Sequence, residues 1–293
     1  METTGSHVPV ASDVACNCCG NTTVKPLPDL SLLLNIAAPG QLVACTRCGL
    51  LYQSPQPTGD ALKAFYDDAA YYDRSPLAGG DEEAAPHLMR RLADLERRLG
   101  DKGRFLDVGC AKGAFVGYAA AQGWQAEGVD VSVWATEQAR ERGLAIKTGT
   151  LEEQHYPDAT FNVVHSSHML EHVSDPLATL KEMRRILQPT GLLALEVPQE
   201  LGSVYESFRI RAGIRPTPTL PSPHLFFFQK ATLCQMLSTA GFQVIQVSTR
   251  NFPIIGRSRY LFGMGNAVTR TLFALDTVTK RGPNLVVLAR PSQ

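Results

Sequence analysis

Four cysteines near the start of the chain have the spacing of ligands for a metal ion. They form two Cys-x-x-Cys-Gly pairs, Cys16 with Cys19 and Cys45 with Cys48. Four thiolates suit tetrahedral Zn²⁺, and the glycine after each pair permits a tight turn around the ion. A site with four protein ligands predicts a structural role; iron is the alternative metal, and reduced surface thiols are the alternative to a metal. Cys16 with Cys18 is a rival pairing, although the Cys-x-x-Cys-Gly pattern favours Cys19.

A second group of residues has the pattern of a nucleoside-binding loop. The segment LDVGCAKG, residues 106–113, follows an expected strand and opens an expected helix. Gly109 allows a sharp turn, and Gly113 lets the helix start close to a ligand that its amide groups can bind. Asp130 ends the next expected strand, where a carboxylate can accept hydrogen bonds from both ribose hydroxyls. Because the middle glycine of the dinucleotide fingerprint is missing, a nucleoside without a diphosphate is expected, with a purely structural turn as the alternative.

The elements that must position these residues alternate between short apolar runs and helical patterns from Arg104 onward. Strands separated by helices of this length predict right-handed βαβ units and a parallel sheet. The expected fold class is therefore α/β, with helices on both faces of a seven-stranded sheet. The seven expected strands cover residues 105–109, 125–132, 144–149, 161–167, 191–198, 242–248 and 283–290.

Composition limits what the protein can be. The 293 residues carry 28 Lys and Arg against 28 Asp and Glu, and 44% are apolar. Zero net charge argues against a general nucleic-acid binder and against a polybasic membrane anchor. We find no apolar run of the ~20 residues that span a bilayer, and the first residues have neither the basic nor the apolar part of a secretory signal. A cytoplasmic protein is expected.

The same patterns divide the chain into parts of different character. The parts are a disordered tail over 1–12, a metal-binding head over 13–58, a helical linker or lid over 59–99, and a ligand-binding domain over 100–293 that carries substrate-side insertions at 199–225 and 251–282.

Several motifs together resemble the class I S-adenosylmethionine (SAM)-dependent methyltransferases. They are LDVGCAKG, the acid in GVDVS, the Gly-Thr-Leu-Glu step from Gly149, FNVVHSSHMLEHVSDP, and GLLALEVP. The pattern is most similar to a broad bacterial group with LEHV and a following Asp-Pro after the fourth strand, and with His-x-Phe-Phe-Phe before the sixth. The resemblance covers roughly residues 100–250 and the last strand. It implies a Rossmann-like fold and SAM as cofactor, and it is not specific for a substrate.

The resemblance also implies roles for individual residues around SAM. Asp107, Gly109 and Gly113 surround the methionine part, in the loop that includes Cys110. Asp130 holds the ribose, and Val131 packs on the adenine. The remaining expected cofactor residues are Thr150 and Leu151 at the adenine edge, and Ser166 and Ser167 near the sulfonium.

The head and the helix after it resemble the zinc-ribbon head that some of these methyltransferases carry. In those proteins a Tyr-rich helix reaches over the SAM site. Tyr66, Tyr71 and Tyr72 are therefore candidate lid residues, and packing between head and core is their alternative role.

Two histidines are candidate proton acceptors. Methyl transfer from a sulfonium is mostly a matter of alignment, and it needs a base only when the acceptor loses a proton. His168 follows the fourth strand, and His224 follows the Pro-rich part of the first insertion. His172 belongs to the shared LEHV element and is expected to be structural or to face the cofactor. Ordinary packing is the alternative for each of them.

Three functions fit the sequence. The first is methylation of oxygen, nitrogen or carbon in a small-molecule acceptor, in a biosynthetic setting. The aromatic residues of 251–282 suit an apolar acceptor or a homodimer contact. The second is an RNA methyltransferase with a zinc head, which zero net charge disfavours, so no nucleic-acid partner is expected. The third is a SAM-fold protein without catalysis that binds a protein partner through its head.

Overall fold

The computed structural model describes residues 14–36, 39–66, 81–213, 224–250 and 266–292. Its helices are α1 (Pro28–Leu33), α2 (Gly59–Tyr66), α4 (Asp81–Leu99), α5 (Ala114–Ala121), α6 (Val133–Glu141), α7 (Pro176–Ile186), α8 (Val204–Arg211), α9 (Lys230–Thr239) and α10 (Asn266–Thr279), with the 3-10 turns η1 (Glu152–Gln154) and η2 (Leu170–His172). Its strands are β1 (Val24–Pro26), β2 (Gln41–Cys45), β3 (Leu51–Ser54), β4 (Arg104–Val108), β5 (Gln125–Asp130), β6 (Ile146–Thr148), β7 (Phe161–Ser167), β8 (Leu187–Pro198), β9 (Phe226–Phe227), β10 (Phe242–Arg250) and β11 (Asn284–Pro291).

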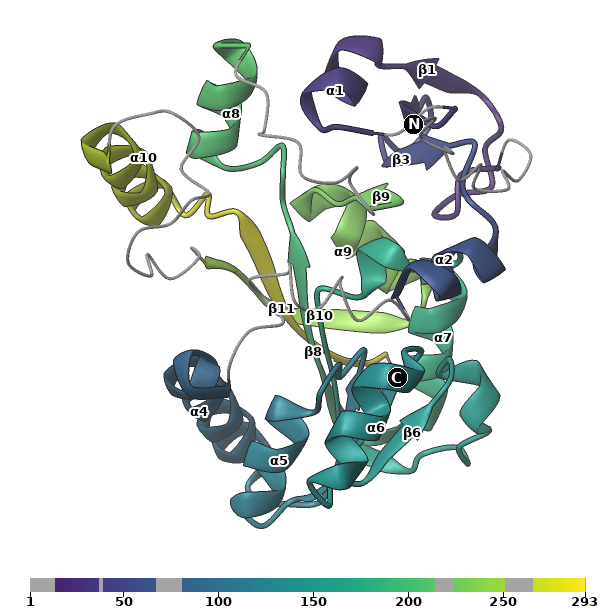
Figure 1. Ribbon diagram of the computed structural model, residues 1–293, viewed down its shortest axis with the longest axis vertical. Coiled ribbons are helices and arrows are strands. Elements are labelled where there is room, and N and C mark those ends of the chain that lie inside the picture. The colour runs from purple at the N-terminus through teal and green to yellow at the C-terminus, as the bar shows by residue number, and fades with distance from the viewer. Residues whose placement is uncertain (1–13, 37–38, 67–80, 214–223, 251–265, 293) are drawn as a thin grey trace, which may run out of the picture.

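A seven-stranded sheet in the order β10-β11-β8-β7-β4-β5-β6 forms the centre of the molecule (Figure 1). Neighbouring strands from β8 to β6 are parallel, and β11 runs antiparallel to both β8 and β10. The predicted α/β class and seven-stranded sheet are confirmed. Along the chain, β5 and β6 are added on one side of β4, and β7 and β8 on its other side. Open α/β sheets bind ligands at such a change of direction in the strand order.

Alternate residues of the central strands face two different helical layers. Phe105 and Val163 pack with α4 and α5 in one cluster, while Leu106 and Val164 pack with α7 and α9 in another. Because successive side chains of a strand point to opposite faces, strands covered on both faces are rich in apolar residues. This requirement explains the apolar runs in the sequence, within which Asp107, His165 and Glu196 are buried polar exceptions.

The N-terminal head has its own four-stranded sheet in the order β1-β2-β3-β9. Its fourth strand comes from far along the chain, since Phe226 and Phe227 pair with Tyr52 and Leu51 of β3 (Figure 1). This Phe run directly precedes the helix α9, which begins at Lys230.

The two predicted insertions pack against each other through the helices α8 and α10. Asp276 of α10 accepts a hydrogen bond from the backbone of Val204 at 2.5 Å, and the rings of Tyr205 and Phe273 lie 5.2 Å apart. Among the residues that the structure describes, none of the helices is long and apolar enough to cross a membrane.

Candidate functional site

The loop after β4 is held by Asp130 at the end of β5. Gly109, Ala111 and Gly113 all have left-handed backbones, with φ of 75°, 47° and 76°. The two carboxylate oxygens of Asp130 accept hydrogen bonds from the amides of Ala111 at 2.8 Å and Ser132 at 2.9 Å. The carboxylate therefore fixes the conformation of the loop.

Both glycines of this loop are required by space as well as by conformation. A Cβ on Gly109 would lie 2.6 Å from Cβ of Met169, and a Cβ on Gly113 would lie 2.3 Å from Cδ1 of Ile146. Contacts this short force neighbouring groups to move. Gly113 thus serves the packing of α5 against β6.

Asp107 is held in a buried pair that the sequence analysis did not predict. Its carboxylate lies 2.6 Å from Nδ1 of His165, and the His165 ring packs between Phe105 and Phe115. Burial lowers the pKa of His165, with a smaller contribution from the charge of Arg91, while Asp107 acts in the opposite direction. The signal that could have revealed this pair is a polar residue inside each of two adjacent apolar strands.

Cys110 points away from the open side of the loop. Its Sγ lies against Gly128, where an added Cβ would come within 2.7 Å of it, and it packs with Val116, Ala139 and Ile146. Burial raises the pKa of this thiol well above its usual value. Its side chain is therefore a neutral core group, which leaves only its backbone to face a ligand.

The other expected cofactor residues lie along the same edge of the sheet. The amide of Gly149 donates to the carbonyl of Asp130 at 2.9 Å, which brings the segment after β6 beside β5. Ser166 is opposite Val108 in the sheet register. Their exposure differs: Thr150 is exposed, Val131 and Ser167 are half-buried, and Leu151 and Ser166 are buried.

His168 follows β7 in a strained conformation between two buried carboxylates. Its φ is 53°, and its amide donates to the carbonyl of Glu196 at 2.9 Å. Its ring nitrogens lie 3.6 Å from Glu171 and 3.7 Å from Glu196. Burial alone would lower the pKa of His168, but the two carboxylates outweigh it and raise that pKa to about 9. Left-handed non-glycine residues are uncommon and concentrate at functional sites.

Glu196 links three elements beneath His168, and sequence reasoning gave it no role. This residue of β8 is fully buried, and its carboxylate accepts hydrogen bonds from Arg91 of α4 and Arg250 of β10, each at 2.9 Å. An acid inside the apolar run GLLALEVP is the signal that could have identified it, because a buried charge needs partners.

His172 and His224 meet beside Glu171, although the sequence separates them widely. Their rings lie 4.8 Å apart. Nδ1 of His172 is 2.6 Å from the hydroxyl of Tyr66, and Nδ1 of His224 is hydrogen-bonded to Glu200. Burial would lower the pKa of His224, but Glu200 and then Glu171 raise it above its usual value.

Three of the five residues predicted on the acceptor side lie close together among the residues that the structure describes. The sequence singled out His168, His224 and Tyr66, and all three lie in or against one cluster, which we call the His/Glu cluster. It consists of the buried Glu171 and Glu196 and of four half-buried residues, His168, His172, Glu200 and His224. Tyr71 and Tyr72 lie outside the residues that the structure describes.

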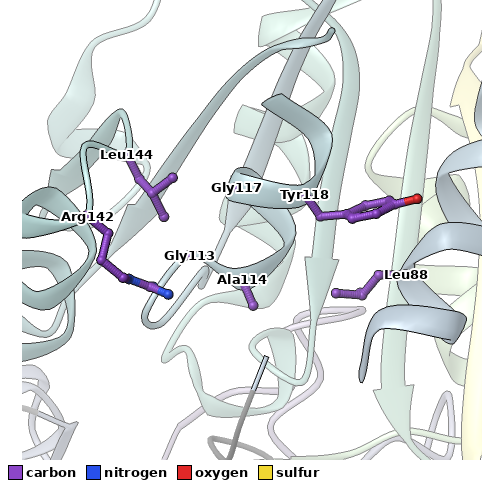
Figure 2. Close-up of a pocket in the computed structure, with 7 residues that line it drawn as sticks. All are labelled: Leu88, Gly113, Ala114, Gly117, Tyr118, Arg142 and Leu144. Carbon is purple, nitrogen blue, oxygen red and sulfur yellow. The ribbon is translucent and has the colours of Figure 1, made fainter. Parts of the chain in front are cut away.

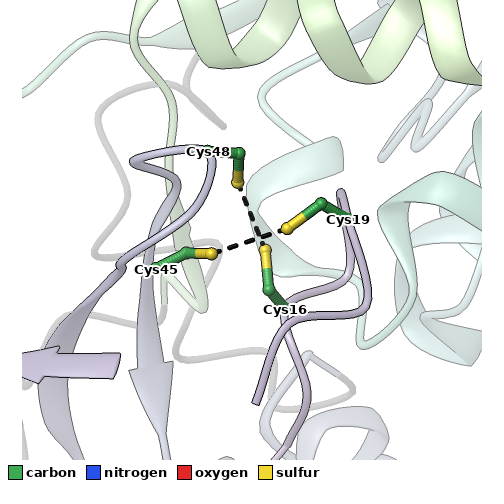
Figure 3. Close-up of side chains that lie close together, drawn as sticks. All are labelled: Cys16, Cys19, Cys45 and Cys48. Carbon is green, nitrogen blue, oxygen red and sulfur yellow. Dashed lines mark hydrogen bonds between the residues drawn. The ribbon is translucent and has the colours of Figure 1, made fainter. Parts of the chain in front are cut away.

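The four predicted cysteine ligands form a compact group in the head (Figure 3). Sγ of Cys16 lies 3.4 Å from that of Cys48, and Sγ of Cys19 lies 3.5 Å from that of Cys45. Tetrahedral zinc with Zn–S bonds of about 2.3 Å requires sulfur atoms roughly 3.8 Å apart. The group therefore fits zinc after a small expansion, and Cys18 is not part of it.

A small cavity of about 260 Å³ adjoins the glycine loop at Gly113 (Figure 2). It lies between α4, α5 and the segment after α6, and of the expected cofactor residues it touches only Gly113. Its lining is Leu88, Gly113, Ala114, Gly117, Tyr118, Arg142 and Leu144.

The chain is similar to known methyltransferases. Residues 81–247 match a family described as a methyltransferase domain. The chain is 33% identical over 144 residues to the 27-O-demethylrifamycin SV methyltransferase of Amycolatopsis mediterranei, covering 44% of this chain and 52% of that protein. It is 27% identical over 154 residues to a ubiquinone biosynthesis O-methyltransferase of Aeromonas salmonicida, covering 50% of this chain and 65% of that protein.

A solved SAM-dependent methyltransferase from Archaeoglobus fulgidus has the same fold. It superposes with a TM-score of 0.55 at 18% identity, covering 76% of this chain and all of that one. The chain spans about half the length of the curated relatives that it matches. The matched family, the sheet order and the loop held by Asp130 agree, and the chain belongs to the class I SAM-dependent methyltransferases.

Proposed function

We propose that this protein transfers the methyl group of SAM to an oxygen atom of a small-molecule acceptor by in-line displacement. The observation that carries the proposal is the His/Glu cluster at the carboxyl end of β7, one strand away from the glycine loop after β4. The names of two relatives support oxygen, since one is an O-methyltransferase and the other acts on a molecule that lacks an O-methyl group.

The cofactor side of the proposed site is the loop after β4 with the ends of β5 and β6. We assign the ribose hydroxyls to Asp130 and the methionine part to the backbone around Gly109 and Gly113. Support comes from the way one carboxylate holds this loop open in a left-handed conformation. Val131, Thr150 and Leu151 are assigned to the adenine, and Ser166 and Ser167 to the sulfonium side.

The acceptor side is assigned to the His/Glu cluster together with α8 and α10. An imidazolium at His168 can donate a hydrogen bond to an acceptor oxygen, and the neutral imidazole can take its proton. His224 is the second candidate for that proton transfer, since Glu200 can stabilise the imidazolium that forms. A methyl transfer needs such a group when the acceptor is a hydroxyl.

We also propose that residues 13–58 are a head that binds one structural Zn²⁺ through Cys16, Cys19, Cys45 and Cys48. The distances between the sulfur atoms and the supply of four thiol ligands support this role. Metal analysis of the purified protein should give zinc. Replacing Cys45 by Ser should abolish that zinc and lower the temperature at which the protein unfolds, whereas Cys18→Ser should leave the metal content unchanged.

A direct assay tests the proposed reaction. The protein is titrated calorimetrically with SAM and then incubated with methyl-labelled SAM and a panel of phenols, aliphatic alcohols, amines and carbon acids. We expect SAM binding and label transfer to a hydroxyl compound. Lack of SAM binding would refute the enzyme, and transfer only to amines or carbon acids would refute the choice of oxygen.

A further inference from the structure

We propose that Glu171, His172 and His224 form a binding site for a divalent cation on the acceptor side of the protein. One ligand atom of each residue lies within 4.8 Å of the others. Two imidazole nitrogens and one carboxylate oxygen are a donor set that binds first-row transition-metal ions. This group shares no residue with the cysteine cluster of the head.

The carboxylate of Glu171 supplies an independent reason to expect a ligand. Its side chain is fully buried, and neither of its oxygens has a hydrogen-bond partner in the part of the chain that the structure describes. The closest imidazole nitrogens lie 3.5 Å away on His172 and 3.6 Å away on His168, beyond the usual 2.7–3.2 Å of such bonds. A cation between the carboxylate and the imidazoles would give these oxygens direct ligand bonds, and a buried carboxylate without a hydrogen bond is otherwise costly.

Both histidines are oriented as metal ligands usually are. A histidine that binds a metal through one ring nitrogen generally uses the other to contact a carboxylate, a carbonyl or a similar group, which fixes the ring. Nδ1 of His172 contacts the hydroxyl of Tyr66 at 2.6 Å, and Nδ1 of His224 contacts the carboxylate of Glu200. Nε2 of His172 is the nitrogen that approaches Glu171.

The backbone brings the three ligands together from two distant segments. Glu171 and His172 are neighbours in η2, and the carbonyl of Glu171 accepts a hydrogen bond from the amide of Leu225 at 2.8 Å. That bond places His224 against η2, and the pairing of β9 with β3 holds the following residues. The site therefore rests on ordered backbone.

The donor set also limits which ion is expected. Imidazole and carboxylate together suit Zn²⁺, Fe²⁺, Co²⁺ or Mn²⁺ better than Ca²⁺ or Mg²⁺, which prefer oxygen alone. Three protein ligands leave at least one coordination position for water or for an oxygen of the acceptor. In this arrangement His224 holds a cation, and His168 is the histidine left to exchange a proton with the acceptor.

The experiment measures metal binding without SAM or acceptor, so its outcome does not depend on the proposed reaction. Protein with zinc already in its cysteine site is dialysed against micromolar Co²⁺, and bound metal is measured by elemental analysis and visible absorption. We expect a further equivalent of cobalt per chain with d–d absorption and without thiolate charge-transfer bands. No further equivalent, or one with thiolate bands, would overturn the proposal.

Variants locate the ion. Glu171→Gln and His224→Asn should each lose the additional cobalt, whereas His168→Asn should keep it, because His168 touches the same carboxylate but is not among the three ligands. Tyr66→Phe changes no ligand and should weaken cobalt binding by about 10–100-fold. It also serves as the test if the ligand variants fail to fold. Cobalt binding that is unchanged in Glu171→Gln, or in Tyr66→Phe, would refute the assignment.

Discussion

The cofactor side and the acceptor side of this site are built in different ways. On the cofactor side, one carboxylate binds backbone amides of its own βαβ unit, and Asp130 reaches Ala111 across 19 residues of chain. On the acceptor side, side chains meet from remote segments: Tyr66 contacts His172 across 106 residues, and Arg91 contacts Glu196 across 105. The first arrangement recurs as a motif because it is local, while the second depends on how the whole chain is folded.

This difference predicts that the two sides can be disabled separately. A change on the acceptor side should affect turnover and leave SAM affinity intact, and a change at Asp130 should do the reverse. Glu196 lies under His168 and joins α4, β8 and β10, so a change there should affect the stability of the whole domain.

The largest effect is expected from His168→Asn. Asparagine tolerates the left-handed backbone of this position, so the variant removes the imidazole with little strain. Loss of a group that exchanges a proton with the acceptor should lower kcat by about 10²–10⁴-fold, or roughly 3–5 kcal/mol. Steady-state kinetics at saturating SAM measure this change. Calorimetry should give an unchanged Kd for SAM, and a weakened Kd would show that the two sides are not separate.

Glu196→Gln should lower the free energy of unfolding by about 3–5 kcal/mol. The variant leaves two guanidinium groups beside an uncharged amide, and Arg91 is itself only 8% exposed. Urea denaturation followed by circular dichroism measures the change.

Asp94→Asn is the matched control for Glu196→Gln, since it also removes the charge of a carboxylate that pairs with two arginines, but the side chain of Asp94 is 40% exposed. Exposed pairs contribute less than about 1 kcal/mol. Equal losses in the two variants would contradict the role given to the buried pair.

Asp130→Asn should weaken SAM binding by about 1–3 kcal/mol. The asparagine side chain can accept hydrogen bonds only through its oxygen, so its NH₂ group would face either a backbone amide or the ribose. Calorimetric titration with SAM measures the loss. At saturating SAM, kcat should stay close to that of the unmodified protein. A fall in kcat with unchanged affinity would reverse the assignment of this residue.

The smallest effect on catalysis is expected from Tyr66→Phe. One hydrogen bond to His172 is lost, which is worth about 0.5–1.5 kcal/mol. We expect a several-fold decrease in kcat/KM for the acceptor and no change in the Kd of SAM. Competition binding with SAM checks the second point. A larger effect on SAM than on the acceptor would move Tyr66 to the cofactor side.

Local patterns in the sequence predict the local parts of the structure. Apolar runs such as FLDVG and FNVVHSS predict the central strands because both faces of these strands are covered. The cysteine spacing favours Cys19 over Cys18, and the group of four in the structure contains Cys19. By contrast, the strand at Phe226 could not be predicted from its neighbours in sequence, since its partner, Tyr52, lies far away in the chain.

The polar groups of the core show the same limit. An acid within GLLALEVP indicates that Glu196 must find a partner, but nothing near it in the sequence identifies Arg91 or Arg250. His165 likewise gives no sign of its contact with Asp107 until the sheet register places the two side by side. Pairwise contacts across a sheet are fixed by the fold as a whole.

The edge strand that the head takes from β9 has a consequence for protein engineering. Phe226 and Phe227 complete the sheet of the head. His224 lies only two residues before Phe226 in the chain. The head therefore cannot be exchanged as an independent unit. Removing it, or grafting it onto another methyltransferase, would leave an open strand edge and uncover Phe226 and Phe227, and it would release the anchor of His224 at the same time. A shortened chain would inherit both defects, so a minimal catalytic fragment must retain the cysteine-rich head.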